Sequence, residues 1–348
     1  MHPIGVGFID LNAEGRFHFE RLHLRPEFRC VAGWNAASDL AAVSHGRLPE
    51  NADSPLAVID DPHVSLVWIG PAAPAALITA ALTAGKHVLM GLPVGISSPD
   101  WRYWTHHGTR ICVAALHRWD GAFQMAKSVV DADGLGDLID VRRHSRQYVP
   151  VELEFRRAAD GTLIEDLAAR QNELRIVRLK WFEILDELLL LVSDPVSAVT
   201  ARPIGIRRHA GLETIHPHSR VVRPRLSSDP EMGDLSNHSR GMAVWVEFAN
   251  GCQAGLELER RSLAPLETGW ILNGTRAGFS QGQRFQPGAD HELVDVPVEE
   301  LPTDQNAFYD ALVETIQHGA NFPVTPDSML RVLEVLAMTS GPAHQSLS

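Results

Sequence analysis

The sequence predicts an α/β fold, a doubly wound parallel sheet, followed by an α+β domain with an open mixed or antiparallel sheet. In the first third of the chain, short apolar runs alternate with segments of helical spacing, which is typical of a parallel sheet covered by helices. Later segments alternate apolar and polar residues across a tight-turn dipeptide, which is typical of antiparallel strands. The length of 348 residues exceeds one ordinary core and favours two domains.

The elements of the first domain follow one another as strand and helix. The apolar runs that we expect to form buried parallel strands are Pro3–Ile9, Arg29–Trp34, Ser65–Gly70, His87–Met90 and Ile111–Leu116. Helical spacing covers Phe17–Leu24 and Pro74–Ala84. Because crossovers between parallel strands are right-handed, these elements predict one sheet with helices on both faces. We place the domain boundary after the last strand, so that residues 1–118 form the first domain and residues 119–348 the second.

The second domain has longer, alternating strands. Ala243–Phe248 and Cys252–Leu258 are joined by Asn250-Gly251, a dipeptide favoured in tight hairpin turns. The segment His216–Asn237, rich in Pro, Ser, Arg and His, is expected to be a long loop. The helices expected in this domain are Phe123–Val130, Leu174–Val192, Asn306–His318 and Asp327–Met338.

Charge and composition exclude several classes of protein. The chain carries 31 Lys and Arg against 43 Asp and Glu, and a net charge of -12 repels nucleic acid. No apolar run is long enough to span a membrane, and we expect a soluble, cytoplasmic protein. Cys30, Cys112 and Cys252 form no CxxC motif, which fits a reducing compartment and indicates no disulfide framework.

The segment Ala84–Pro93 reads AGKHVLMGLP and resembles the AGKHVLVEKP segment of the glucose-fructose oxidoreductase, inositol dehydrogenase and MocA (Gfo/Idh/MocA) family. Further matches in the family's order are His117–Asp120 with Leu135–Leu138, Asn273–Gly278, and Pro323–Pro326 before the last helix. The resemblance runs from about Ile4 to Met338. It implies a Rossmann-like, dinucleotide-binding-type first domain, a carboxy-terminal substrate and oligomerisation domain, and NAD(P) in the cleft between them.

The first loop of such a domain needs glycines, because a pyrophosphate rests on bare backbone at a helix amino terminus. When Gly15 is matched to the last glycine of the pattern, Asp10 and Asn12 stand where the first two glycines belong. Asparagine tolerates positive φ, but a carboxylate near a pyrophosphate costs about 1 kcal/mol at 4 Å in water and about 4 kcal/mol when partly screened. The other register, Gly5-Val6-Gly7, leaves almost no strand before the turn, and its third position is again Asp10.

Other positions that the resemblance assigns to the cofactor also lack their usual side chains. Asn35 stands in place of the acidic residue that holds the ribose hydroxyls, and Pro71–Ala76 replaces the family's TPxxxH segment. Leu92, followed by Pro93, replaces the lysine of the EKP motif, which stabilises charge on the reacting oxygen. We therefore assign no cofactor: NAD or NADP is possible but disfavoured, and ordinary hydride transfer is expected to be lost.

The family's helix motif DxxxHxxD falls on Leu179, Glu183 and Asp186, and only the last position keeps its residue type. Glu183 and Asp186 are three residues apart on one helix and share a face. Two such carboxylates are suited to acid–base work when burial separates their pKa values. A solvated or salt-bridged helix face is the alternative.

Two more candidates come from the end of the first domain and from a predicted strand. His117 and Arg118 follow the last parallel strand, either in the cleft or in domain packing. Tyr148 alternates along a strand with Arg143, His144 and Arg146, so part of this set faces away from any pocket. A metal site is not expected, because a Pro-rich loop is a poor frame for His216, His218 and His238. The candidate catalytic residues are His117, Tyr148, Glu183 and Asp186.

Three functions are compatible with a retained fold and an altered cofactor loop. The first is a non-redox acid–base enzyme that acts on a small polar or sugar-derived metabolite in the inter-domain cleft. The second is a catalytically silent or regulatory subunit that pairs with an active relative. The third is a divergent NAD(P)-dependent oxidoreductase of sugar or secondary metabolism. The expected partners are a small molecule and a second copy of the chain or that relative, without nucleic acid or membrane.

Overall fold

The computed structural model forms two compact units. The first comprises Met1–Asp120 and Asp304–Leu333, and the second Gly121–Thr303 and Glu334–Ser348. The residues that the structure describes are 2–11, 13–34, 50–71, 73–93, 98–105, 110–148, 155–157, 163–165, 167–204, 221–222, 241–290 and 292–339. Each unit has a sheet and helices of its own.

The first unit is built on a six-stranded sheet in which neighbouring strands are parallel. Every residue of β1, β4 and β6 is buried, as a sheet covered on both faces requires. The strand order 3-2-1-4-5-6 reverses between β1 and β4, which is the order of the dinucleotide-binding α/β fold. The predicted fold class is confirmed. The strands are β3 (Glu50–Asn51), β2 (Phe28–Trp34), β1 (Ile4–Ile9), β4 (Leu66–Ile69), β5 (His87–Met90) and β6 (Ile111–Val113).

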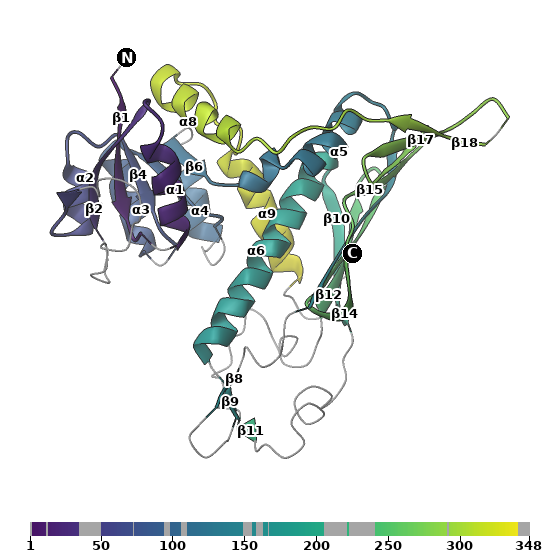
Figure 1. Ribbon diagram of the computed structural model, residues 1–348, viewed down its shortest axis with the longest axis horizontal. Coiled ribbons are helices and arrows are strands. Elements are labelled where there is room, and N and C mark those ends of the chain that lie inside the picture. The colour runs from purple at the N-terminus through teal and green to yellow at the C-terminus, as the bar shows by residue number, and fades with distance from the viewer. Residues whose placement is uncertain are drawn as a thin grey trace. The chain divides into compact units, whose positions relative to one another are not determined.

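Helices flank this sheet (Figure 1). Helix α2 has Ser54 as its N-cap, and the Ser54 hydroxyl accepts a hydrogen bond from the Ala57 amide at 3.1 Å. Lys86 Nζ donates to the carbonyl oxygens of Asp61 and Val64 at 2.8 and 2.7 Å, which fixes the loop before β4. The helices of this unit are α1 (Ala13–His23), α2 (Pro55–Asp60), α3 (Ala75–Thr83), α4 (Ser98–Thr105), the 3-10 turn η3 (Leu116–Trp119), α8 (Asn306–His318) and, as far as Leu333, α9 (Pro326–Thr339).

The segment Asp304–Leu333 returns to the first unit, which the sequence analysis does not predict. Tyr309 of α8 is fully buried and shares a hydrogen bond of 2.9 Å with the buried His18 of α1. Helical periodicity identifies the buried face of α8 but not the core on which it packs, so the pattern alone could not assign it. The roles expected for residues 1–118 and 119–348 stay a prediction.

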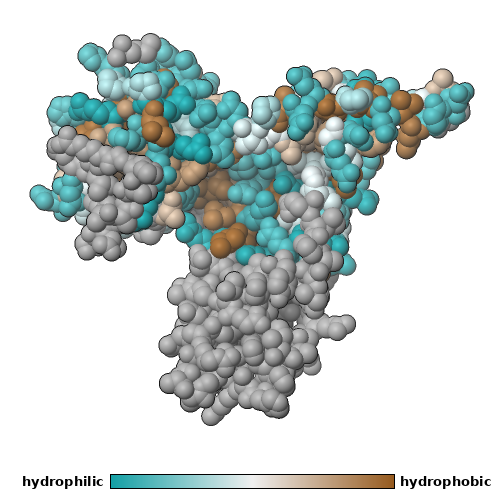
Figure 2. Space-filling model, in the orientation of Figure 1, coloured by the Kyte–Doolittle hydropathy of each residue, from teal (hydrophilic) through white to brown (hydrophobic). Residues whose placement is uncertain are grey.

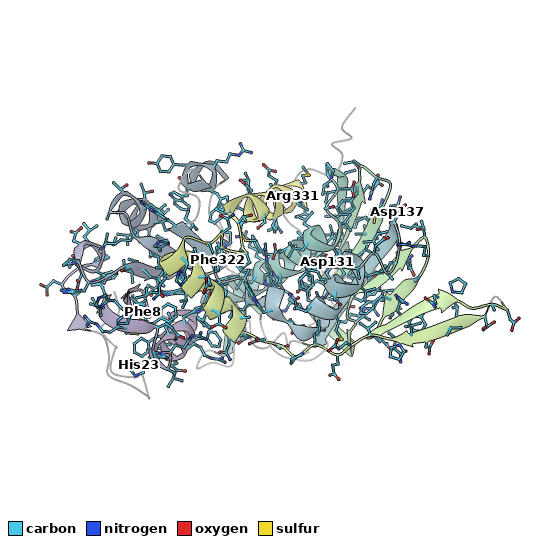
Figure 3. The ribbon with its side chains drawn as sticks, turned by 90° about the horizontal axis from the view of Figure 1, so that it is seen from above. Phe8, His23, Asp131, Asp137, Phe322 and Arg331 are labelled. Atoms are coloured by element: carbon cyan, nitrogen blue, oxygen red, sulfur yellow. The ribbon has the colours of Figure 1, made fainter. Side chains whose placement is uncertain are left out.

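Aromatic rings hold the same segment in place. The ring of Phe308 meets those of Trp119 and Phe322 edge to face, with centroids 5.3 and 5.6 Å apart. Phe8 of β1 packs edge to face on Phe19 of α1 at 5.4 Å, and Figure 3 labels Phe8 and Phe322 in this unit. Residues from both ends of the chain therefore share one aromatic core.

The second unit is built on a mixed sheet, as predicted. The β13–β7 pair is parallel and the other pairs are antiparallel. Gly251 joins β12 and β13 with φ 88°, the left-handed angle that a tight turn requires. The strands in spatial order are β10 (Val196–Ile204), β12 (Gly241–Phe248), β13 (Gln253–Glu259), β7 (Leu138–Tyr148), β15 (Ile271–Gly274), β16 (Gly278–Ser280), β17 (Gln283–Pro287) and β18 (Leu293–Pro297), with β14 (Arg261–Glu267) also paired to β7.

Two helices belong to this unit, α5 (Gly121–Asp131) and α6 (Leu167–Leu191). In Figure 1, α6 lies along one face of the sheet. Leu185 and Leu188 are fully buried, which agrees with the helix predicted over Leu174–Val192. A small third sheet contains β8 (Phe155–Arg157), β9 (Leu163–Glu165) and β11 (Val221–Val222). The loop expected at His216–Asn237 lies outside the described residues apart from β11.

Hydrophilic residues cover much of the described surface in Figure 2. Apolar residues show on the hairpin of β17 and β18, where Leu293 is 70% exposed. Within the described part of the chain, no helix combines the length and the apolar character that crossing a membrane requires. Ligands of sheets with this topology bind at the carboxyl ends of the strands, beside the point where the strand order reverses.

Candidate functional site

The turn between β1 and α1 lies at that edge of the first sheet. Asp10 follows β1 directly, and its amide donates a hydrogen bond of 2.9 Å to the carbonyl oxygen of Trp34. Its φ of 64° lies in the left-handed region, which glycine adopts without strain. The turn therefore keeps a backbone bend that suits glycine while it carries a carboxylate.

The Asp10 side chain lies against the residue that follows β4. A Cβ atom on Gly70 would come within 2.7 Å of Asp10 Oδ2 and 2.6 Å of the Asp10 carbonyl oxygen. Real Cβ atoms do not approach so closely, so position 70 requires glycine. The space above the end of β4 is taken by Asp10 itself.

A second carboxylate occupies the end of the next strand. Glu14 belongs to the first turn of α1, and its carboxylate lies against Gly91, which follows β5. A Cβ atom on Gly91 would lie 3.0 Å from Glu14 Oε2 and would collide with Oε1. In the motif that this segment resembles, the position of Gly91 carries a glutamate, so here Glu14 places a carboxylate in the space that this side chain would need. Sequence reasoning missed Glu14, because the contact joins residues far apart in the chain.

Gly15, the third matched glycine, is explained by packing. A Cβ atom on Gly15 would lie 2.7 Å from Nε1 of Trp68 and 3.1 Å from the carbonyl oxygen of Asp10. Trp68 is fully buried in β4, so the glycine lets α1 approach the sheet over a bulky indole. Close helix-to-strand packing is the role that the third glycine has in dinucleotide-binding turns as well.

The residues at this edge do not fit the diphosphate of a dinucleotide. A helix amino terminus attracts an anion through its dipole and its free N–H groups. Asp10 and Glu14 already place two carboxylates at this end of α1. A third anion about 4 Å from each would be repelled by about 1 kcal/mol per charge in water and more where solvent is excluded. The amino terminus of α1 is therefore a poor seat for phosphate.

Two other positions matched to the cofactor, Leu92 and Pro93, add no side-chain donor. Leu92 is half-buried and Pro93 is buried directly after β5, and neither side chain donates a hydrogen bond. Asn12 and Asn35 lie outside the described residues. Of the six positions matched to the cofactor, the structure therefore describes four, which are Asp10, Gly15, Leu92 and Pro93.

His117 and Arg118 lie in η3, after the last strand of the sheet. His117 is half-buried. Arg118 is 6% exposed, and its guanidinium donates to the carbonyl oxygen of Pro323 at 3.0 Å and to Ser328 Oγ at 2.9 Å. Arg118 therefore ties η3 to the start of α9 within the first unit, a structural role.

Glu183 and Asp186 lie on α6, where burial separates them. Asp186 is 1% exposed, whereas the Glu183 side chain is 32% exposed and pairs with Lys180 at 3.3 Å. That pair is the salt-bridged helix face weighed above as the alternative to catalysis. Although Glu183 and Asp186 were expected to share one face of the helix, Asp186 lies in the core and Glu183 lies at the surface.

A buried ion pair that the sequence analysis did not single out lies beside them. Glu187 is 4% exposed, and its carboxylate pairs with Arg143 of β7 and accepts a hydrogen bond of 2.6 Å from Trp270 Nε1. The Arg143 guanidinium also stacks 5.1 Å from the centre of the Trp270 ring. A sequence signal existed: Glu187 lies within a leucine-rich run, and a charge there needs a partner.

The opposite face of β7 carries His144 and Arg146, both of which bond to Glu257 Oε2 at 2.9 Å. Burial alone would raise the pKa of Glu257, but the bonds from Arg146 and His144 lower it overall. Tyr148 pairs through its backbone with Arg261, and its side chain lies outside the described residues. The described residues contain no cluster of three or more His, Cys, Asp or Glu placed to bind a metal; His216, His218 and His238 lie outside them.

No protein-family model and no curated protein matches this sequence. Solved structures do match across almost the whole chain. A "putative oxidoreductase" from Yersinia pestis superposes with a TM-score of 0.72 at 17% identity, covering 96% of this chain and 93% of that one. An NAD-binding protein from Listeria innocua gives 0.68 at 19% identity with the same coverage, and a "putative myo-inositol dehydrogenase" from Sinorhizobium meliloti 1021 gives 0.67 at 16%, covering 96% and 95%. The chain has the fold of these oxidoreductases and NAD-binding proteins, in agreement with the resemblance read from its sequence.

Proposed function

We propose that the chain is a small-molecule enzyme with an oxidoreductase fold that does not carry out ordinary NAD(P)-dependent hydride transfer. The observation that carries this proposal is the Asp10 carboxylate, which lies over Gly70 at the turn where a diphosphate would bind. Leu92, which stands at the lysine position of the resembling motif, supports it because leucine neither donates nor accepts a proton.

The chemistry that we propose is acid–base catalysis on a small polar or sugar-derived metabolite. His117, Tyr148, Glu183 and Asp186 are the candidate groups. Asp186 is buried and Glu183 is partly exposed, so the two carboxylates lie in different surroundings on one helix. Assembly into homo-oligomers, pairing with an active relative and a cytoplasmic location also stay predictions.

The test is a panel of polyols, sugars and sugar acids incubated with the purified protein. Nicotinamide reduction is followed by absorbance, and the substrates are followed by proton NMR. We expect a substrate to change without added nucleotide and the change to be lost in Glu183→Gln and in His117→Ala. The exposed Glu247→Gln is the matched control for loss of one carboxylate in the second unit. Turnover that depends on added NAD⁺ or NADP⁺ would contradict the proposal.

A second candidate function is a divergent NAD(P)-dependent oxidoreductase. It is favoured by solved structures of this fold named as an NAD-binding protein and as a "putative nadph-dependent oxidoreductase" from Desulfitobacterium hafniense. This function requires the nucleotide to bind despite Asp10. Titration of the protein with NADH and NADPH, followed by nicotinamide fluorescence, separates the two: micromolar affinity favours the second candidate, and no saturation favours the first.

A further inference from the structure

We infer that the amino terminus of α1 is filled by the chain's own carboxylates, Asp10 and Glu14, and that this edge of the sheet selects against phosphorylated ligands. The inference deepens the proposed function, on which it rests, by naming a class of ligand that the site rejects. It concerns phosphate in general, whether the phosphate belongs to a dinucleotide, a mononucleotide or a sugar phosphate.

The first step is the position of the two carboxylates on neighbouring strands. β1 lies next to β4, and β4 lies next to β5, in one parallel sheet. Asp10 extends from the end of β1 to Gly70 at the end of β4. Glu14 extends from α1 to Gly91 at the end of β5. The two side chains therefore reach the ends of two adjacent strands on one edge.

The second step concerns the glycines below them. A glycine at the end of a strand is often read as room for a ligand to approach the backbone. At Gly70 and Gly91 the missing Cβ atoms instead leave room for Asp10 and Glu14, because any Cβ there would collide with these carboxylates. The space that a phosphate would need against bare backbone already holds carboxylate oxygens.

The third step is electrostatic. The dipole and free N–H groups of a helix amino terminus stabilise a negative charge, and Glu14 places a carboxylate in the first turn. A phosphate that entered would lose this site of attraction and meet two like charges. At about 4 Å in water-like surroundings each like charge weakens binding by roughly fivefold to tenfold, and by more where solvent is excluded.

The experiment measures phosphate binding after both charges are removed without a change of shape. The Asp10→Asn/Glu14→Gln double variant keeps both side-chain volumes, and asparagine tolerates the positive φ at position 10. The control is Glu20→Gln/Asp60→Asn, which makes the same change in net charge at two exposed positions of the first unit. Calorimetric titration with inorganic pyrophosphate and with ADP is carried out on both variants and on the unaltered protein.

We expect the unaltered protein and the control to show equally weak binding and the double variant to bind at least about tenfold more tightly. The inference is overturned if the double variant binds no more tightly than the control, or if the unaltered protein already binds pyrophosphate as tightly as the double variant. Thermal unfolding verifies that the variants are folded. If the double variant does not fold, Asp10→Gly/Glu14→Gln takes its place, since glycine relieves the strain at position 10.

The inference and the proposed function fail in different experiments. If the double variant does not bind pyrophosphate or ADP more tightly than the control, the inference about Asp10 and Glu14 is refuted, even when no hydride transfer is found. Nucleotide-dependent turnover by the unaltered protein refutes the proposed function, and the binding data then report whether Asp10 and Glu14 still weaken phosphate binding.

Discussion

The molecule contains two sets of carboxylates in contrasting surroundings. In the second unit, Glu187 is buried against the guanidinium of Arg143 and the indole N–H of Trp270. In the first unit, Asp10 and Glu14 are half-buried and lie against the glycines that end two parallel strands. The first carboxylate is neutralised by a cation on the strand below it, whereas the other two lie where the fold commonly receives an anion from outside.

The different surroundings of Glu187 and of Asp10 and Glu14 indicate different roles for these carboxylates. A buried carboxylate that is matched by a guanidinium contributes to the structure, and removing its partner leaves an uncompensated charge. Carboxylates at a helix amino terminus are favourable for the helix but exclude other anions. Burial and charge alone do not distinguish the two cases; the place of each carboxylate in the fold does.

The largest effect is expected when the partner of Glu187 is removed. Arg143→Met takes the guanidinium away from the buried Glu187 carboxylate, and we expect the free energy of unfolding to fall by about 3–5 kcal/mol. Urea denaturation measures this loss. The matched control is Arg142→Met on the same strand, because the Arg142 side chain is 58% exposed and pairs with Asp140 at the surface. We expect that change to cost less than about 1 kcal/mol, and equal losses in the two variants would refute a structural role for the buried pair.

A smaller effect is expected from His18, a buried polar side chain on the same helix as Glu14. Burial, with a further contribution from Arg21, lowers the pKa of His18 to about 3, so the folded protein holds this ring neutral. The unfolded chain takes up a proton below pH 6.5, so the stability is complete above that pH and is lost as the pH falls towards 3. Between pH 7.5 and pH 5 we expect a loss of about 2 kcal/mol in the free energy of unfolding.

Urea denaturation at these two pH values measures the loss due to His18. A His18→Gln variant removes the titrating ring and should show a shallower dependence on pH. A variant of the exposed His63, His63→Gln, should keep the dependence of the unaltered protein. A pH dependence that is the same in His18→Gln and in the unaltered protein would refute the buried neutral ring.

A still smaller loss of stability is expected for a substitution at Gly15. This substitution tests whether the glycine is required by the packing of α1 on β4. Gly15→Ala brings a Cβ atom to 2.7 Å from Trp68 Nε1. Overpacking costs about 1–3 kcal/mol, and alanine returns up to about 1 kcal/mol in a helix, so we expect a net loss of about 1–2 kcal/mol. Thermal unfolding measures it. An unchanged midpoint would mean that Gly15 is not required by the packing of α1 on β4.

The smallest effect is expected at the exposed pair of Lys180 and Glu183. Both side chains are about a third exposed, and an ion pair of this kind contributes less than about 1 kcal/mol. We expect Lys180→Met to change the free energy of unfolding by about 0.5 kcal/mol or less. A much larger loss in urea denaturation would mean that the pair of Lys180 and Glu183 is needed for folding. A loss of activity in the Glu183→Gln variant could then not be assigned to catalysis.

Most of the fold could be predicted because its elements have local patterns. The central strands β1 and β4 are uninterrupted apolar runs, and Asn250-Gly251 marks a hairpin turn that the structure contains. The helices α2 and α4 were not predicted, since with six and eight residues each is too short for a helical period to be recognised. The placement of α8 in the first unit depends on Tyr309 and His18, which are 291 positions apart.

The candidate site was predictable in part for the same reason. Asp10 could be identified from its position after the first strand, because the turn follows the strand directly. The contact of Glu14 with Gly91 and the pairing of Glu187 with Arg143 join distant parts of the chain, and no local pattern encodes them. What a sequence gives locally is the type of residue at a site; its partner is set by the tertiary fold.

The most direct test of the central claim is a crystal structure of the protein grown with NADH and, separately, with pyrophosphate at high concentration. The account predicts that the carboxylates of Asp10 and Glu14 lie against Gly70 and Gly91 and that no phosphorus atom is bound at the first turn of α1. A diphosphate at that turn, with either carboxylate displaced, would contradict it.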